Sequence, residues 1–238
     1  MGKIGVHEIL VELENFGDAQ TKKTLGRHGA REPFFGVKVA DLKTILKKTK
    51  KNHELSLELY QTGNSDAMYL AGLMADEKRI TEAQLDDWIN KAYWYYLSEY
   101  AVPWVASETS FGFEIGLKWI QSDREHIAAA GWCTLSGFAA VNQDKDLDIN
   151  AYSRLLDKIS LEIHNSPNRV RHTMNGFVIA IGTYVMELTD MALQTASKIG
   201  NVSVDMNGTA CKVPSATEYI NKSKAAGPTG KKRKAARC

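Results

Sequence analysis

The chain has 238 residues, of which 44% are hydrophobic and 24% are charged, a composition typical of a soluble globular protein with a sizeable core. The formal net charge is +2, but the last 17 residues contain seven of the 30 basic residues and no acidic residue. The remainder therefore has 23 basic against 28 acidic side chains. Attraction to phosphates is expected mainly in this tail, unless the folded body gathers its basic side chains on one face. A tail that only keeps the protein soluble is the alternative.

The N-terminal segment lacks the basic and then apolar pattern of an export signal, and Val6 stands where a myristoylation signal has Ser or Thr. The most apolar stretch, residues 127–141, is interrupted by polar residues and is shorter than the roughly 18 residues that a membrane-spanning helix needs. The three cysteines, Cys133, Cys211 and Cys238, are widely spaced and lack the spacing of metal ligands. We therefore expect a cytoplasmic protein with reduced thiols, no membrane partner, no metal and no cofactor.

Helix follows helix along most of the chain. Apolar residues recur at steps of three and four, as in the series Val39, Leu42, Ile45 and Leu46, which is the pattern of amphipathic helices. The alternating run Val202–Val204 is too short to form a sheet. Turn and capping residues place helix boundaries at Asp18, 26–29, 33–36, 62–65, 78–81, 142–148 and 165–167. This spacing predicts about ten helices of 10 to 20 residues.

The helix pairs recur every 35 to 40 residues or so, which is roughly the period of HEAT and armadillo repeats. The sequence therefore predicts an all-α solenoid of HEAT-like repeats, with residues 1–224 as a single domain and residues 225–238 as a basic, disordered tail. Thr81, followed by Gln84, and the pair Ser166-Pro167 are predicted to begin helices.

The segment from Tyr93 to Trp104 is dense in aromatic residues. On one continuous helix, Tyr93, Leu97, Tyr100 and Trp104 would share a side, which favours packing in the core. The alternative is an aromatic wall, in which Trp94 beside Glu99 would hold an electron-poor or cationic base in a groove.

Two later segments carry polar groups. Arg169, Arg171 and His172 lie near a predicted helix start, where side chains and backbone amides can contact phosphates; a solvated helix start is the alternative. The segment 204–214 contains an Asn-Gly turn, Cys211 and Lys212, and we expect an ordered loop packed under the terminal repeat. A nucleophilic Cys211 would need His172 or Lys212 within reach.

Three stretches, in the correct order, resemble the AlkD-like DNA alkylation repair family: residues 34–42, residues 94–98, and Trp119-Ile120 with residues 125–131. The resemblance spans roughly residues 5–210. It implies a solenoid of HEAT-like repeats and excision of alkylated purines without flipping of the base. Ser98 stands where catalytic members have an aspartate, and Ala128 and Ala129 stand where they have paired arginines. Glu99 replaces the aspartate only if the local alignment slips by one residue.

We predict a monomer that binds duplex DNA, alkylated or branched, in a concave groove. The resemblance leaves open whether the protein is a DNA glycosylase. The candidate catalytic residues are Trp94, Glu99 and Ser98. The candidate DNA-binding residues are Arg169, Arg171, His172, Asn175, Lys212 and Trp104. The alternative is a non-catalytic helical-repeat scaffold that binds a protein or peptide, which the acidic body favours.

Overall fold

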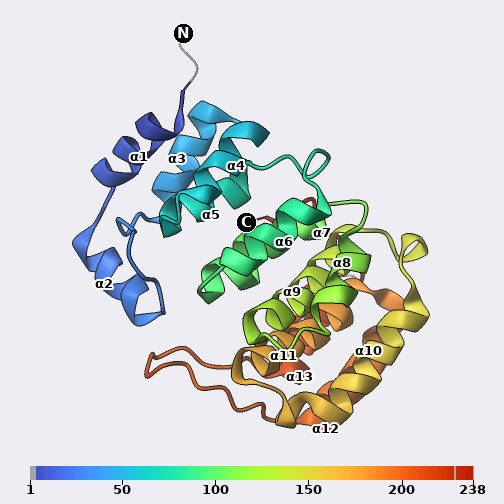
Figure 1. Cartoon of the computed structure of the whole chain (residues 1–238). Coiled ribbons are helices and arrows are strands. Elements are labelled where there is room, and N and C mark those ends of the chain that lie inside the picture. The colour runs from blue at the N-terminus through green and yellow to red at the C-terminus, as the bar shows by residue number, and fades with distance from the viewer. Residues whose placement is uncertain (1–3, 228, 238) are drawn as a thin grey trace. The chain divides into compact units, whose positions relative to one another are not determined.

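The computed structural model of the protein describes residues 4–227 and 229–237. Within these ranges the chain forms thirteen α-helices, several short 3₁₀ or π turns, and no β-strand (Figure 1). The prediction of an all-α chain with ten or more helices is therefore confirmed. The chain divides into two compact units, residues up to Val105 together with Arg237, and residues from Ala106 to Ala236. The prediction of a single domain stays a prediction.

Unit 1 is built around helix α5, all ten residues of which are buried. The helices of this unit are α1 (Val6–Asn15), α2 (Ala19–Arg27), α3 (Val39–Thr49), α4 (His53–Gln61), α5 (Ser65–Met74) and α6 (Glu82–Lys91), followed by a π-helix (Tyr96–Ala101) and the start of α7 (Val102–Ser107). Helices α1, α3 and α4 and the π-helix pack against α5.

Helix starts in unit 1 follow local capping chemistry. The Asp18 carboxylate accepts a hydrogen bond of 2.7 Å from the Thr21 amide at the start of α2. At α6, the Thr81 hydroxyl accepts from the Gln84 amide while the Gln84 side chain accepts from the Thr81 amide. This reciprocal pair satisfies two amides that have no partner within the helix. The predicted helix start at Thr81 is confirmed.

Unit 2 is built from the helices that follow α7. They are α8 (Gly112–Trp119), α9 (Glu125–Val141), α10 (Ile149–Glu162), α11 (Asn168–Tyr184), α12 (Thr189–Ile199) and α13 (Ala216–Ala226). Helix α11 is capped by Pro167 rather than by Ser166. The prediction of Ser166 as the cap is wrong because its hydroxyl donates backwards to the Glu162 carbonyl, at 3.0 Å.

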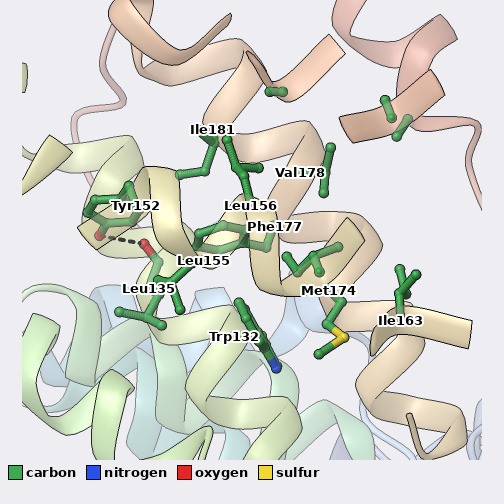
Figure 2. Close-up of a cluster of buried hydrophobic side chains, with 14 of the residues drawn as sticks. Trp132, Leu135, Tyr152, Leu155, Leu156, Ile163, Met174, Phe177, Val178 and Ile181 are labelled. Carbon is green, nitrogen blue, oxygen red and sulfur yellow. Dashed lines mark hydrogen bonds between the residues drawn. The ribbon is translucent and has the colours of Figure 1, made fainter. Parts of the chain in front are cut away.

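The core of unit 2 is formed where α9, α10 and α11 meet (Figure 2). The Phe177 ring stacks on Tyr152, with centroids 5.9 Å apart, and meets the edge of Trp132 at 5.1 Å. The Tyr152 hydroxyl donates to the Leu135 carbonyl at 3.1 Å, so the phenol is buried without an unsatisfied oxygen. These aromatic contacts hold α9, α10 and α11 against one another.

The close packing of α8 against α9 depends on glycine. A Cβ atom on Gly131 would lie 2.5 Å from the Ile120 backbone nitrogen. On the same helix, Ala128 and Ala129 are buried. Ala128 and Ala129 therefore serve helix packing in this chain.

The C-terminal segment 229–236, here called the strap, lies against unit 2. Three backbone amides and one lysine side chain of the strap donate hydrogen bonds to residues at or just beyond the ends of α7, α9 and α11. The hydrogen bonds run from Gly230 N to Thr183 O (3.0 Å), Lys232 Nζ to Ala139 O (2.8 Å), Arg233 N to Ala140 O (2.8 Å) and Ala236 N to Glu108 Oε1 (2.6 Å).

The predicted disorder of residues 225–238 is therefore wrong for the strap. Ala139 and Ala140 lie in the last turn of α9, where carbonyl groups have no partner within the helix. The strap supplies these partners, and the Lys232 ammonium, whose side chain is 8% exposed, also pairs with Asp144 at 2.6 Å. The composition of the C-terminal residues indicates their positive charge, but it does not predict where they dock. Pro228 and Cys238 lie outside the described residues.

Neither Cys133 nor Cys211 is in a disulfide. In the described part of the chain, no group of three or more His, Cys, Asp or Glu side chains is arranged to hold a metal ion. Over the same residues, no single helix is long and apolar enough to cross a membrane; only α11 together with Met186–Ile199, a pair bent by 115°, meets the length and composition of a span.

Candidate nucleic-acid interface

The aromatic segment of unit 1 is wound as a π-helix rather than as an α-helix. Residues Tyr96–Ala101 form the π-turn, and the Val102 amide donates to the Leu97 carbonyl five residues earlier. Pro103 has no amide hydrogen, so it cannot donate to the Glu99 carbonyl as an α-helix would require. Such single π-turns are frequent at functional sites.

The π-turn shifts the side chains relative to an α-helix. Trp94, Leu97, Ser98 and Glu99 are buried, whereas Tyr100 is 38% exposed. The prediction that Tyr100 packs in the core is therefore wrong, because the π-turn changes the register after Trp94.

Trp94 is held on two sides. Its Nε1–H donates to the Ser65 hydroxyl at 2.9 Å, and its ring stacks on Tyr96 with centroids 4.5 Å apart. Trp104, the other tryptophan among the candidate site residues, is half-buried. Its ring meets those of Tyr69 and Tyr100 edge-on, with centroids 5.4 Å and 5.8 Å away. A fixed aromatic cluster results, and the role of Trp94 as a stacking surface for a base stays a prediction.

The two polar candidates beside Trp94 are both buried. Ser98 is 2% exposed, and its hydroxyl donates to the Trp94 carbonyl at 3.3 Å. Glu99 is 6% exposed. Ser98 thus donates to a backbone carbonyl in the π-turn and brings no charge to this part of the site.

A carboxylate that sequence reasoning missed lies near Trp94. Asp66, in the first turn of α5, is 4% exposed and accepts three backbone hydrogen bonds, from Phe35 (2.6 Å), Gly36 (3.0 Å) and Val37 (3.1 Å). Burial raises the pKa of the Asp66 carboxyl, and the three amides only partly oppose this effect.

Only glycine fits in the loop that Asp66 holds. Gly36 has φ +82°, and a Cβ there would lie 2.5 Å from the Lys22 backbone nitrogen. An acidic residue in the first turn of a helix is common, so the sequence offered no signal that this one anchors a distant loop.

The basic candidates of unit 2 gather at the start of α11. Arg169, Arg171 and His172 are half-buried. The Arg169 guanidinium lies 3.4 Å from the His172 ring, and Arg171 donates to the Asn168 side chain at 3.4 Å. The Arg169 amide donates to the Glu125 carboxylate at 2.7 Å. The structure therefore brings these three predicted residues together on one helix turn, next to an acidic neighbour.

Two asparagines of α11 fasten the loop 200–215, which leads from α12 to α13 (Figure 1). Asn168 exchanges two hydrogen bonds with the backbone of Asp205, at 2.9 Å and 2.7 Å. Asn175 donates to the Pro214 carbonyl at 2.9 Å and is 1% exposed. Asn175, predicted to contact DNA, is thus a buried support of the loop.

The tip of this loop is a tight turn with exposed residues. Asn207 and Gly208 have φ of +54° and +66°, and the Thr209 amide donates to the Met206 carbonyl at 3.1 Å. This is the geometry that Asn-Gly favours in a two-residue turn. Lys212 and Cys211 beyond it are exposed. The predicted loop is held by Asn168 and Asn175, but its tip is exposed rather than packed under the terminal repeat, and Lys212 faces solvent.

Among solved structures, one with a TM-score of 0.91 and 36% sequence identity covers 99% of this chain and 100% of its own. That structure is described as a new family of proteins related to the HEAT-like repeat DNA glycosylases with affinity for branched DNA structures. The fold therefore defines a HEAT-like helical-repeat protein, which confirms the predicted fold class.

The DNA alkylation repair enzyme family matches residues 9–220, and the chain belongs to this family. Two curated relatives are uncharacterised proteins, Lin0241 of Listeria innocua and Lmo0209 of Listeria monocytogenes. They are 30% and 31% identical to this chain over 220 residues, which is 90% of this chain and 94% of theirs.

Proposed function

We propose that this protein binds branched DNA through its phosphate backbone and does not excise bases. The observation that carries the proposal is the neutral, buried Ser98 hydroxyl in a chain that is 36% identical over 99% of its length to a relative with affinity for branched DNA. Recognition without turnover is the function that best accounts for both features.

Base excision needs a group that stabilises the positive charge on the sugar as the base departs. The Ser98 hydroxyl carries no charge and is engaged by the Trp94 carbonyl. Glu99 is the nearest carboxylate in sequence, and it is buried. We therefore expect duplex DNA that contains methylated purines to be bound without release of a base.

The proposed contacts with phosphates lie in unit 2. Arg169, Arg171 and His172 share the first turns of α11, where backbone amides add positive potential. Lys212 extends from the loop that Asn168 and Asn175 fasten. Contacts of this kind fix the register on DNA without reading its sequence, which suits a protein that recognises the form of a junction.

A binding titration tests the proposal directly. A four-way junction and a linear duplex of the same strands are titrated by fluorescence anisotropy in about 50 mM and about 200 mM salt. We expect the junction to bind at least about tenfold more tightly, which corresponds to about 1.4 kcal/mol. The variant Lys212→Ala should weaken binding and reduce the salt slope by about one counterion.

The matched control is Lys158→Ala. Lys158 is half-buried on α10 and its charge is already paired with Glu162 on the same helix, so its loss should leave binding unchanged. Equal affinity for junction and duplex would contradict the proposal. Absence of any salt-dependent binding would favour the alternative of a scaffold for a protein or peptide.

Base release from methylated duplex DNA is measured in parallel with Trp94→Ala and Glu99→Gln. We expect no release above the level without protein, even with protein in excess. Release that is lost in both variants would instead establish a glycosylase with a displaced carboxylate, and the non-catalytic part of the proposal would fail.

A further inference from the structure

Unit 1 contains a cavity of about 210 Å³ between α2, α3, α5 and the π-helix. An apolar cavity of about 150 Å³ holds a benzene ring, whereas pockets for drug-sized ligands begin at about 300 Å³. The volume therefore suits one ring system somewhat larger than benzene. Lys38 is exposed and is one of the lining residues, so the cavity reaches the protein surface.

Most of the cavity wall is aromatic or aliphatic. Trp94 and the Tyr96 ring stacked on it line one part, with an interplanar angle of 15°. Leu25, Val39 and Leu42 line another part. Flat rings of this kind match a planar ligand, because aromatic contacts gain energy beyond the burial of area.

The remaining wall is polar. Ser65 and Asp66, the first residues of α5, both line the cavity. The Asp66 carboxylate has about four acceptor positions, and backbone amides occupy three of them. The cavity wall thus includes a buried carboxylate, and a buried acceptor favours an N–H group over an apolar one.

The geometry points to a binding site for a planar heteroaromatic ring that carries an N–H donor and has the size of a single nucleobase. The ring lies among Trp94, Tyr96 and the aliphatic wall, with its donor edge toward Asp66 and Ser65. Its source is either a free base or an unpaired base at a DNA branch point. Only the second source rests on the proposed function.

Free adenine and benzene are the probes, and the readout is the indole N–H signal of Trp94 in ¹H–¹⁵N spectra, assigned by its loss in Trp94→Phe. We expect adenine to shift this signal saturably and benzene to bind at least about tenfold more weakly. Benzene that binds as well as adenine would overturn the role of the donor. No shift with adenine would overturn the site.

A variant that fills the cavity tests whether the shift of the Trp94 signal arises from adenine bound inside it. Val39→Phe places a ring into the cavity from the half-buried first turn of α3. It should abolish the adenine shift. Val11→Phe adds the same ring on α1, where Val11 is 44% exposed, and should leave the shift intact. Loss in both variants, or in neither, would contradict the assignment.

A junction with 2-aminopurine unpaired at its centre distinguishes the two sources. A fluorescence change that wild type gives and Val39→Phe does not, with junction binding retained, identifies a DNA base as the ligand. An adenine response without a 2-aminopurine response identifies a free base. If junction binding is absent, the proposed function fails while the adenine titration still decides the cavity. If the junction binds but neither probe responds, the cavity inference alone fails.

Discussion

Replacing Asp66 with alanine is expected to lower the free energy of unfolding by about 3 kcal/mol or more. The substitution removes the acceptor of three backbone amides, those of Phe35, Gly36 and Val37. A buried donor without a partner costs about 1 to 3 kcal/mol. The loop cannot easily rearrange to find water, because Gly36 is in contact with the Lys22 backbone. Urea denaturation followed by far-UV circular dichroism measures the change.

The matched control is Glu58→Ala, which removes an exposed carboxylate from α4 in the same unit. It should change the unfolding free energy by less than about 0.5 kcal/mol. If Asp66→Ala were as mild as Glu58→Ala, the three hydrogen bonds would not contribute to stability, and the loop before α3 would have to be held by other contacts.

Deleting the chain from Thr229 onward is expected to lower the unfolding free energy by about 3 kcal/mol and the melting temperature by roughly 6 to 12 °C. The deletion leaves the Ala139 and Ala140 carbonyls of α9 without the partners that the strap supplies. It also leaves Asp144, whose side chain is 22% exposed, without the Lys232 ammonium. Differential scanning calorimetry on both chains checks the loss.

A double substitution distinguishes the effect of strap docking on stability from the effect of the strap's positive charge. Lys231 and Lys234 flank the docked residues and are exposed, so Lys231→Gln with Lys234→Gln should leave the melting temperature unchanged. Lys232→Gln, in contrast, should reproduce part of the effect of the deletion. A deleted chain that melts at the wild-type temperature would show that the strap is not docked in solution.

Local residue patterns were sufficient to predict helices and several of their ends. Thr81 and Gln84 lie three residues apart, and the reciprocal cap between them is a property of that short segment. The sequence predicts an α-helix across Pro103 from a period of 3.6 residues, whereas the structure has a π-turn there. The missing amide of Pro103 is the feature of the sequence that favours such a turn.

The candidate site was predicted only in part, because its supports are contacts between distant segments. The basic cluster at Arg169 to His172 can be predicted because its members are neighbours in the sequence. The role of Asn175 depends on Pro214, 39 residues away, and the role of Asp66 depends on Val37, 29 residues earlier. A single sequence gives no sign of such pairs, so it predicts a DNA contact for Asn175 and no role for Asp66.

The strap also has a consequence for how the protein is made. The Ala139 carbonyl at the end of α9 accepts a hydrogen bond from Lys232, which is 93 residues later in the chain. Helices α10 to α13 are therefore synthesised before Lys232 is available to this carbonyl. The hydrogen bonds between the strap and α9 are among the last contacts of unit 2 that synthesis makes possible.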